Sequence, residues 1–305
     1  LQTYINQITF LSLFKKAPHA YHITHLSNAI SIIQKGKLES RNKASGHFTN
    51  SAGNNVHRRH DAHKFARFYF RPQSPTQFYN ECLGKKKDDN YISQYTKLGS
   101  PKCPLPVFFV FDIQEALQLF PERCYYSTGN MQSDCAKIYK VIEDPNRINA
   151  KGIEQKEYDK NALQQEFLVQ DEVDLTKLTS LQIICFDENV CRWLRQSVVD
   201  NHLTEKITFE REIEHRLFHR KNYQLIYEET DTHLKLDTKL SEGYHFLINF
   251  SGCPPSIDTS CAIRQDVNKI TVAGKFTIKK DVPYEIYFED EQATERSWLI
   301  YNNHE

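Results

Sequence analysis

The pattern of apolar and polar residues divides the chain into a mixed first part and a second part that is rich in strands. Short apolar runs in the first part predict strands at 20–24, 65–70, 106–112, 166–169 and 181–186. The run at 106–112 is apolar at almost every position, as expected of a strand that is buried on both faces. Segments with helical spacing lie between these strands, and this arrangement is typical of an α+β fold.

The clearest helix is predicted at 27–35, where Ile30 and Ile33 have helical spacing. Ser27 suits the N-cap of this helix and Gly36 its C-cap. Further helices are expected at 4–14, 113–119 and 190–199.

From about residue 222 the apolar residues alternate with polar ones, which predicts a series of strands separated by Asp, Gly and Pro turns. We therefore expect two domains, a mixed one at 1–205 and a β-rich one at 206–305. The predicted C-terminal strands are 223–228, 245–250, 269–272, 276–278, 284–288 and 297–301.

Charge and cysteine content narrow the class of protein. Lys plus Arg and Asp plus Glu both number 39, so a nucleic-acid-binding surface has to be local. The eight cysteines form no CxxC pair, which favours reduced thiols. The apolar runs are too short to span a membrane, and no signal-peptide pattern is present. These features predict a cytoplasmic protein with no membrane partner.

A candidate catalytic carboxylate is Glu166, which follows Gln164 and Gln165 and precedes an apolar strand. A carboxylate at the start of a buried strand is held rigidly, and it is suited to orienting a ribose or accepting a proton. The alternative is an ordinary structural glutamate.

The stretch 57–71 contains the densest mixture of basic and aromatic residues in the chain. Arg58, Arg59 and Arg67 are suited to phosphates, and Tyr69 to stacking on nicotinamide, adenine or an unpaired base. The alternative is that the aromatic residues at 68 and 70 belong to the core, with Arg67 and Tyr69 on the opposite face and the remaining charges in solvent.

Histidines recur every third residue at 57, 60 and 63, and again at 19, 22 and 25. On a helix this spacing turns successive side chains by ~300°, so three such ligands drift away from a common point. We therefore expect no metal site.

Five segments in the same order along the first ~200 residues resemble the DarT family of bacterial ADP-ribosyltransferase toxins. Any one of them is unremarkable alone, but the ordered set is specific. The segments are 21–25 with Asn28, Ile30, Ile33 and Gly36; 65–72 with 74–77; 106–111; 127–134; and 165–169.

The resemblance implies an ADP-ribosyltransferase-like fold, with two small packed sheets, flanking helices and NAD⁺ as co-substrate. It implies that Glu166 is catalytic and that His22 and Thr24 lie near the nicotinamide ribose. It also implies an arginine at the NAD⁺ phosphates, for which Arg67 is the first candidate. The alternatives for that position are the neighbouring arginines at 58 and 59, because the loop that carries them does not align securely.

The segment at 125–134 matches the loop expected to present the acceptor nucleotide. By this resemblance Tyr125 and Tyr126 stack on a base, while Asn130 and Asp134 read its Watson–Crick edge. The alternative is an ordinary turn with one buried tyrosine.

Together these observations predict an enzyme that transfers ADP-ribose from NAD⁺ to a base of single-stranded DNA and releases nicotinamide. The resemblance implies a toxin or phage-defence effector with a cognate antitoxin. The alternatives are the same chemistry on RNA, a non-catalytic nucleic-acid-binding module, and a transferase that modifies protein. Residues 206–305 lie outside the resemblance, and their role stays open.

Overall fold

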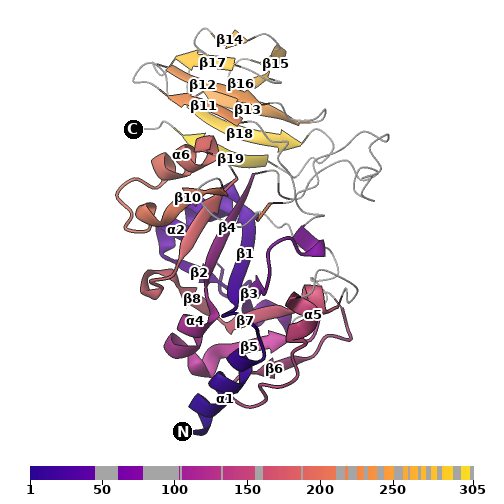
Figure 1. Ribbon diagram of the computed structural model, residues 1–305. Coiled ribbons are helices and arrows are strands. Elements are labelled where there is room, and N and C mark those ends of the chain that lie inside the picture. Colours follow the sequence, from indigo (N-terminus) through magenta and orange to yellow (C-terminus); the bar gives the residue numbers. More distant parts are fainter. Residues whose placement is uncertain are drawn as a thin grey trace.

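The computed structural model (Figure 1) describes most of the first 210 residues. The described stretches are 1–44, 61–77, 103, 105–131, 133–154, 161–186, 188–210 and 217–218, together with the strands between 225 and 302.

A large mixed sheet forms the centre of the first part of the chain (Figure 1). Within the described residues its strands lie in the order β10-β9-β4-β1-β3-β7-β5-β6, and all neighbours are antiparallel except β10 and β9. The strands are β1 His19–His25, β3 Phe65–Tyr69, β4 Pro106–Asp112, β5 Cys124–Ser127, β6 Ile138–Lys140, β7 Glu166–Gln170, β9 Gln182–Cys185 and β10 Ile207–Phe209.

The expectation of two separate small sheets is wrong, because the two halves form one continuous sheet. The halves β10-β9-β4-β1 and β3-β7-β5-β6 are joined where β1 meets β3, through the pair Tyr21 and Tyr69. Pairing at this point satisfies backbone groups that two free strand edges would leave without partners. The single pair makes a narrow joint between the halves.

Helices and a small second sheet surround the large sheet (Figure 1). Strand β2 Lys37–Glu39 pairs with β8 Glu172–Asp174. The helices are α1 Gln2–Ser12, α2 Leu26–Lys35, α4 Ile113–Leu119, α5 Ala150–Glu154 and α6 Glu188–Ser197, with 3₁₀ turns at Ala62–Lys64, Pro121–Arg123, Ala162–Gln164, Leu175–Lys177 and Thr204–Lys206.

Helix α2 begins at Leu26, so its N-cap lies two residues before the predicted one. His25, and not Ser27, is its N-cap, and the His25 side chain accepts a hydrogen bond from the Ser27 backbone N–H. The predicted C-cap is confirmed, because Gly36 ends the helix in the left-handed conformation with φ of 68°.

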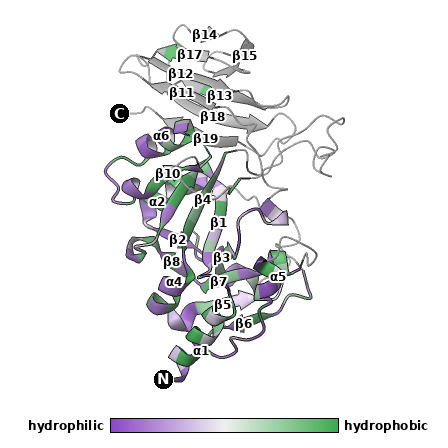
Figure 2. Cartoon of the chain, viewed as in Figure 1, coloured by the Kyte–Doolittle hydropathy of each residue, from purple (hydrophilic) through white to green (hydrophobic). Residues whose placement is uncertain are grey.

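The core contains the apolar faces of both halves of the sheet. Strand β4 is buried along almost its whole length, as its apolar run predicts, and it is coloured green in Figure 2. The ring of Phe68 lies 4.9 Å from that of Phe111 and 6.4 Å from that of Phe167, so one aromatic cluster crosses the joint between β1 and β3. This packing fixes the strands that carry the candidate site.

The C-terminal region is strand-rich, as expected. Within the described residues β11-β12-β17-β14 form one sheet and β15-β16-β13-β18-β19 another. Strand β11 contacts α6 and β19 contacts α2. The strands are β11 Leu225–Glu229, β12 His233–Thr238, β13 Tyr244–Phe250, β14 Ile257–Thr259, β15 Ala262–Asp266, β16 Lys269–Val272, β17 Phe276–Lys279, β18 Tyr284–Asp290 and β19 Ser297–Asn302.

The first part of the chain continues past residue 205. Strand β10 pairs with β9 in the large sheet, and the buried Phe218 ring packs 5.0 Å from the ring of Phe108. Leu217 belongs to the same small apolar cluster.

Candidate active site

Strands β3 and β7 share one face that carries the polar candidate residues, and the aromatic core lies on the opposite face of β3. The burial pattern of β3 alternates, so Ala66 and Phe68 point into the core while Arg67 and Tyr69 lie on the other face. Tyr69 is paired with Glu166 across the two strands. The side chains that the sequence singles out on β3 and β7 are thereby brought onto one face.

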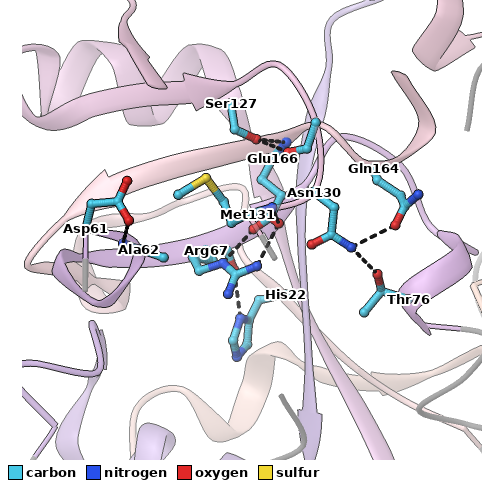
Figure 3. Close-up of polar contacts among 11 residues, drawn as sticks. His22, Asp61, Ala62, Arg67, Thr76, Ser127, Asn130, Met131, Gln164 and Glu166 are labelled. Atoms are coloured by element: carbon cyan, nitrogen blue, oxygen red, sulfur yellow. Dashed lines mark hydrogen bonds and ion pairs between the residues drawn. The ribbon is translucent and has the colours of Figure 1, made fainter. Parts of the chain in front are cut away.

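Glu166 and Arg67 form a two-point ion pair in the centre of this face (Figure 3). Arg67 donates from Nε to Oε2 over 2.6 Å and from Nη2 to Oε1 over 2.7 Å. The Glu166 side chain is 1% exposed and that of Arg67 is 21% exposed. Burial alone would lower the pKa of Arg67, but the charge of Glu166 and these hydrogen bonds raise it above the ordinary value.

The loop after β5 supplies a third donor to the carboxylate. The backbone N–H of Met131 lies 3.0 Å from Oε1 of Glu166, so three N–H groups converge on one buried carboxylate (Figure 3). The Ser127 hydroxyl accepts a hydrogen bond from the Glu166 backbone N–H over 3.0 Å. The carboxylate is therefore held both through its side chain and through the backbone that carries it.

His22 lies beside the ion pair, with Nδ1 2.9 Å from the carbonyl oxygen of Arg67. Burial lowers its pKa to about 4, and the charge of Arg67 acts in the same direction. The ring is therefore neutral at pH 7. A carbonyl oxygen only accepts, so Nδ1 carries the proton and Nε2 is left as a hydrogen-bond acceptor.

Tyr69 supplies a neutral hydroxyl close to the Glu166 carboxylate. Burial, followed by the charge of Glu166, raises its pKa to about 12, and its hydroxyl makes a hydrogen bond with Thr76. It remains protonated at any physiological pH and serves as a donor or acceptor without charge.

The residues predicted to bind the acceptor nucleotide have different surroundings. Asn130 donates from Nδ2 to Oε1 of Gln164 over 2.7 Å and to Oγ1 of Thr76 over 3.1 Å, which ties it to the edge of the site (Figure 3). Tyr125 lies on the same sheet face as Arg67 and donates to Gln170. Asp134 is exposed, farther along the same loop.

The predicted role of Tyr126 in stacking on a base is wrong. Its side chain is 0% exposed and lies 5.3 Å from Phe10 in the core, and its hydroxyl donates to the carbonyl oxygen of Asp144. Successive residues of a strand point to opposite faces, so Tyr125 and Tyr126 cannot both face the site. The alternative of one buried tyrosine holds here.

The remaining residues predicted to contact NAD⁺ are Thr24, Arg58 and Arg59. Thr24 is 5% exposed, and its hydroxyl accepts from Nδ2 of Asn28 over 3.0 Å, which ties β1 to α2. Arg58 and Arg59 lie outside the described residues.

Several residues that support the candidate site have no clear signal in the sequence. Thr76 and Gln164 were not predicted to act, yet both hold Asn130. Ser127 is one serine among many, and the contribution of Met131 is its backbone N–H, which every residue but proline possesses. Polar residues on either side of the loop at 127–131 are the one sequence pattern that points to them.

In the described part of the chain, no three His, Cys, Asp or Glu side chains come together as a metal site would require. His57 and His60, from the histidine series at 57–63, lie outside that part. None of the described helices combines the length and apolarity needed to cross a membrane.

A protein-family model described as "ssDNA thymidine ADP-ribosyltransferase, DarT" matches residues 21–217 of this sequence. The chain belongs to the DarT family. The resemblance seen in the sequence is thus confirmed, and the chain is an NAD-dependent ADP-ribosyltransferase that acts on single-stranded DNA. The match includes every strand of the large sheet in full except β1, whose first two residues precede it.

Solved DarT structures are similar to this chain over 61–65% of its length. DarT of Thermus sp. 2.9 in complex with NAD⁺ has a TM-score of 0.47 and 16% identity, with 65% of this chain and 98% of that chain covered. The same enzyme in complex with ADP-ribosylated single-stranded DNA has a TM-score of 0.46 and 17% identity, with 61% of this chain and 89% of that chain covered. Thermosipho africanus DarTG in complex with ADP-ribose has a TM-score of 0.42 and 19% identity, with 63% of this chain and 49% of that chain covered. No curated protein matches the sequence.

Proposed function

We propose that this chain transfers ADP-ribose from NAD⁺ to a thymidine base of single-stranded DNA, with Glu166 as the catalytic carboxylate. The observation that carries the assignment of the residues is the buried ion pair of Glu166 and Arg67, with the Met131 N–H as third donor. Burying a carboxylate until it is only 1% exposed costs free energy, and a catalytic role explains why the residue is present there.

The chemistry requires a negative group next to the reacting ribose. When the bond between the ribose C1′ and nicotinamide breaks, nicotinamide takes the bonding electrons and positive charge develops on the ribose. A rigid carboxylate stabilises that charge at no cost of reorganisation. Glu166 supplies this carboxylate, and Arg67 and Met131 keep it in one orientation.

The acceptor then forms the new bond to C1′. In thymine the ring nitrogen that is free to react carries a proton, which has to leave as the bond forms. Glu166 is the general base that accepts this proton, and it returns the proton to solvent afterwards. One carboxylate thus serves both bond breaking and bond formation.

His22 and Tyr69 suit the binding of NAD⁺. The neutral His22 ring offers Nε2 as an acceptor, which matches a ribose hydroxyl as donor. Tyr69 offers a hydroxyl that stays neutral beside the ion pair. Thr24 contributes indirectly, through the hydrogen bond that its hydroxyl accepts from Asn28. The NAD⁺ phosphates are bound by Arg67 or by the arginines at 58 and 59.

The acceptor base is bound by β5 and the loop that follows it. Tyr125 lies on the face of the sheet that carries Arg67, where its ring can stack on an unpaired base. Asn130 and Asp134 are the polar side chains proposed to read the edge of the base.

We also propose that the protein is a toxin with a cognate antitoxin, and that the transferase part ends near Phe218. The packing of Phe218 on Phe108 supports this boundary, with a separate β-rich domain following it.

The test uses purified protein, labelled NAD⁺ and four matched pools of single- and double-stranded DNA and RNA. We expect label on single-stranded DNA that contains thymidine, and none on a matched pool without thymidine. The Glu166→Gln variant should lose at least ~10³-fold in rate, since the charge that stabilises the ribose is gone. It should still bind NAD⁺, because the amide is nearly the size of the carboxylate.

Each other outcome is informative. Label on RNA would change the acceptor, and label that resists nuclease but not protease would identify a protein acceptor. Full activity of Glu166→Gln would remove Glu166 from its role. NAD⁺ binding without any transfer would identify a non-catalytic module.

A further inference from the structure

Ser127 occupies a position that links the strand carrying Glu166 to the loop carrying the Met131 N–H (Figure 3). Its side chain is 0% exposed. The hydroxyl accepts from the Glu166 backbone N–H over 3.0 Å and donates to the Gly129 carbonyl oxygen over 2.6 Å. A serine hydroxyl has one proton to donate, and here that proton is directed at the loop.

The position follows from the ladder between β5 and β7. Tyr126 paired with Phe167 is the last backbone pair between these strands. Ser127 comes next on β5 and Glu166 next on β7, and there the serine side chain takes over as acceptor for the Glu166 N–H. The chain is thereby free to turn away from the sheet without leaving a buried N–H unsatisfied.

The same hydroxyl sets the direction of that turn. By donating to Gly129, two residues ahead, Ser127 closes a tight turn at the start of the loop. Met131, which is 0% exposed, then packs with Ala62 and Leu168, and its N–H reaches Oε1 of Glu166 over 3.0 Å. The start of the loop and its contact with the carboxylate are thus both governed by one side chain.

We propose that Ser127 is a positioning residue for the transfer reaction: through its two hydrogen bonds it aligns the Met131 N–H and the Glu166 carboxylate with each other. The inference rests on the proposed role of Glu166. Ser127 is buried and touches neither substrate, so its loss affects the rate of the chemical step more than the binding of NAD⁺.

The neighbouring residue Thr128 provides a matched control for the substitution of Ser127. Thr128 accepts from the Lys137 backbone N–H over 3.1 Å at the neck of the same loop. Thr128→Val removes that hydrogen bond and keeps the shape of the side chain, without touching the link to Glu166. Ser127→Ala removes the link, and Ser127→Cys retains a weaker donor and acceptor.

The experiment measures kcat and KM for NAD⁺ with single-stranded DNA, in the full chain and in these three variants, along with the free energy of unfolding of each. We expect kcat to fall about tenfold or more in Ser127→Ala, as a misdirected hydrogen bond implies, with KM changed less than about twofold. Ser127→Cys should recover part of kcat, and Thr128→Val should lose clearly less of it than Ser127→Ala does.

A kcat for Ser127→Ala equal to that of the unaltered chain would overturn the inference. So would equal losses of kcat in Ser127→Ala and Thr128→Val, since the effect would then belong to the loop as a whole. If the unaltered chain transfers no ADP-ribose, the proposed function itself is wrong, and the role of Ser127 falls with it. If it transfers and Ser127→Ala does too at full rate, only the role of Ser127 is wrong.

Discussion

At the scale of single residues, Glu166 and Arg67 depend on each other. A carboxylate that is 1% exposed loses the solvation of bulk water, and two hydrogen bonds from Arg67 replace part of it. Removing either partner leaves a charge without its compensation. Function and stability are therefore coupled at this pair.

This coupling predicts the behaviour of Arg67→Ala. We expect the free energy of unfolding to fall by about 3 kcal/mol, because the Glu166 charge stays buried without its partner. NAD⁺ affinity and turnover should fall too. The double variant Arg67→Ala with Glu166→Gln should regain part of the stability, as chemical denaturation of all three variants would show. Additive losses in the double variant would contradict the coupling.

His22 predicts a pH dependence of stability. Its pKa is about 4 in the folded chain and 6.5 in the unfolded one, so between these values the unfolded chain binds a proton that the folded chain does not. Stability is therefore fully present above about pH 6.5 and decreases as the pH falls toward 4.

We expect His22→Gln to reduce the slope of unfolding free energy against pH by up to one proton in that window. His25, whose pKa burial lowers to about 3, should contribute its own part of the slope in both proteins. Denaturant titrations at pH 7.5, 5.5 and 4.5 check this. An unchanged slope would mean that His22 is protonated in the fold.

At the scale of elements, α2 illustrates how local signals are modified by neighbours. Gly36 ends the helix as the sequence predicts, but the N-cap moves to His25 because that residue ends β1 and its ring accepts from Ser27. The C-cap depends on a local conformation that glycine adopts easily, whereas the N-cap depends on where the preceding strand stops.

Gly36→Ala should reduce the free energy of unfolding by about 1 kcal/mol or more. The left-handed φ of 68° disfavours a side chain, and a Cβ there would lie 3.0 Å from Cγ2 of Thr176. Thr176→Ser removes that methyl group, so Gly36→Ala in a Thr176→Ser background should cost less and isolate the backbone part. Thermal unfolding of the four proteins measures both parts, and no loss in Gly36→Ala would refute the account.

At the scale of the whole molecule, the site combines residues that are distant in sequence. His22 lies on β1 in one half of the sheet, while Arg67 and Glu166 lie on β3 and β7 in the other. The joint between β1 and β3 brings them together, and the aromatic cluster around Phe68 holds it. The site therefore depends on the packing of both halves.

Periodicity and ordered motifs are local properties of the chain, so the sequence predicted strands β1, β3, β4, β7 and β9, helices α1, α2, α4 and α6, the β-rich C-terminal region and the candidates Glu166, Arg67 and His22. Strands β5, β6 and β10 and helix α5 were not predicted, because they are short and have no clear apolar period. The tertiary structure decided which of the adjacent Tyr125 and Tyr126 faces the site, because strand pairing sets the face. It also decided that the two halves form one sheet and that Ser127 and the Met131 N–H support Glu166. Those contacts join residues far apart in sequence, and only the packed fold brings them within hydrogen-bonding distance.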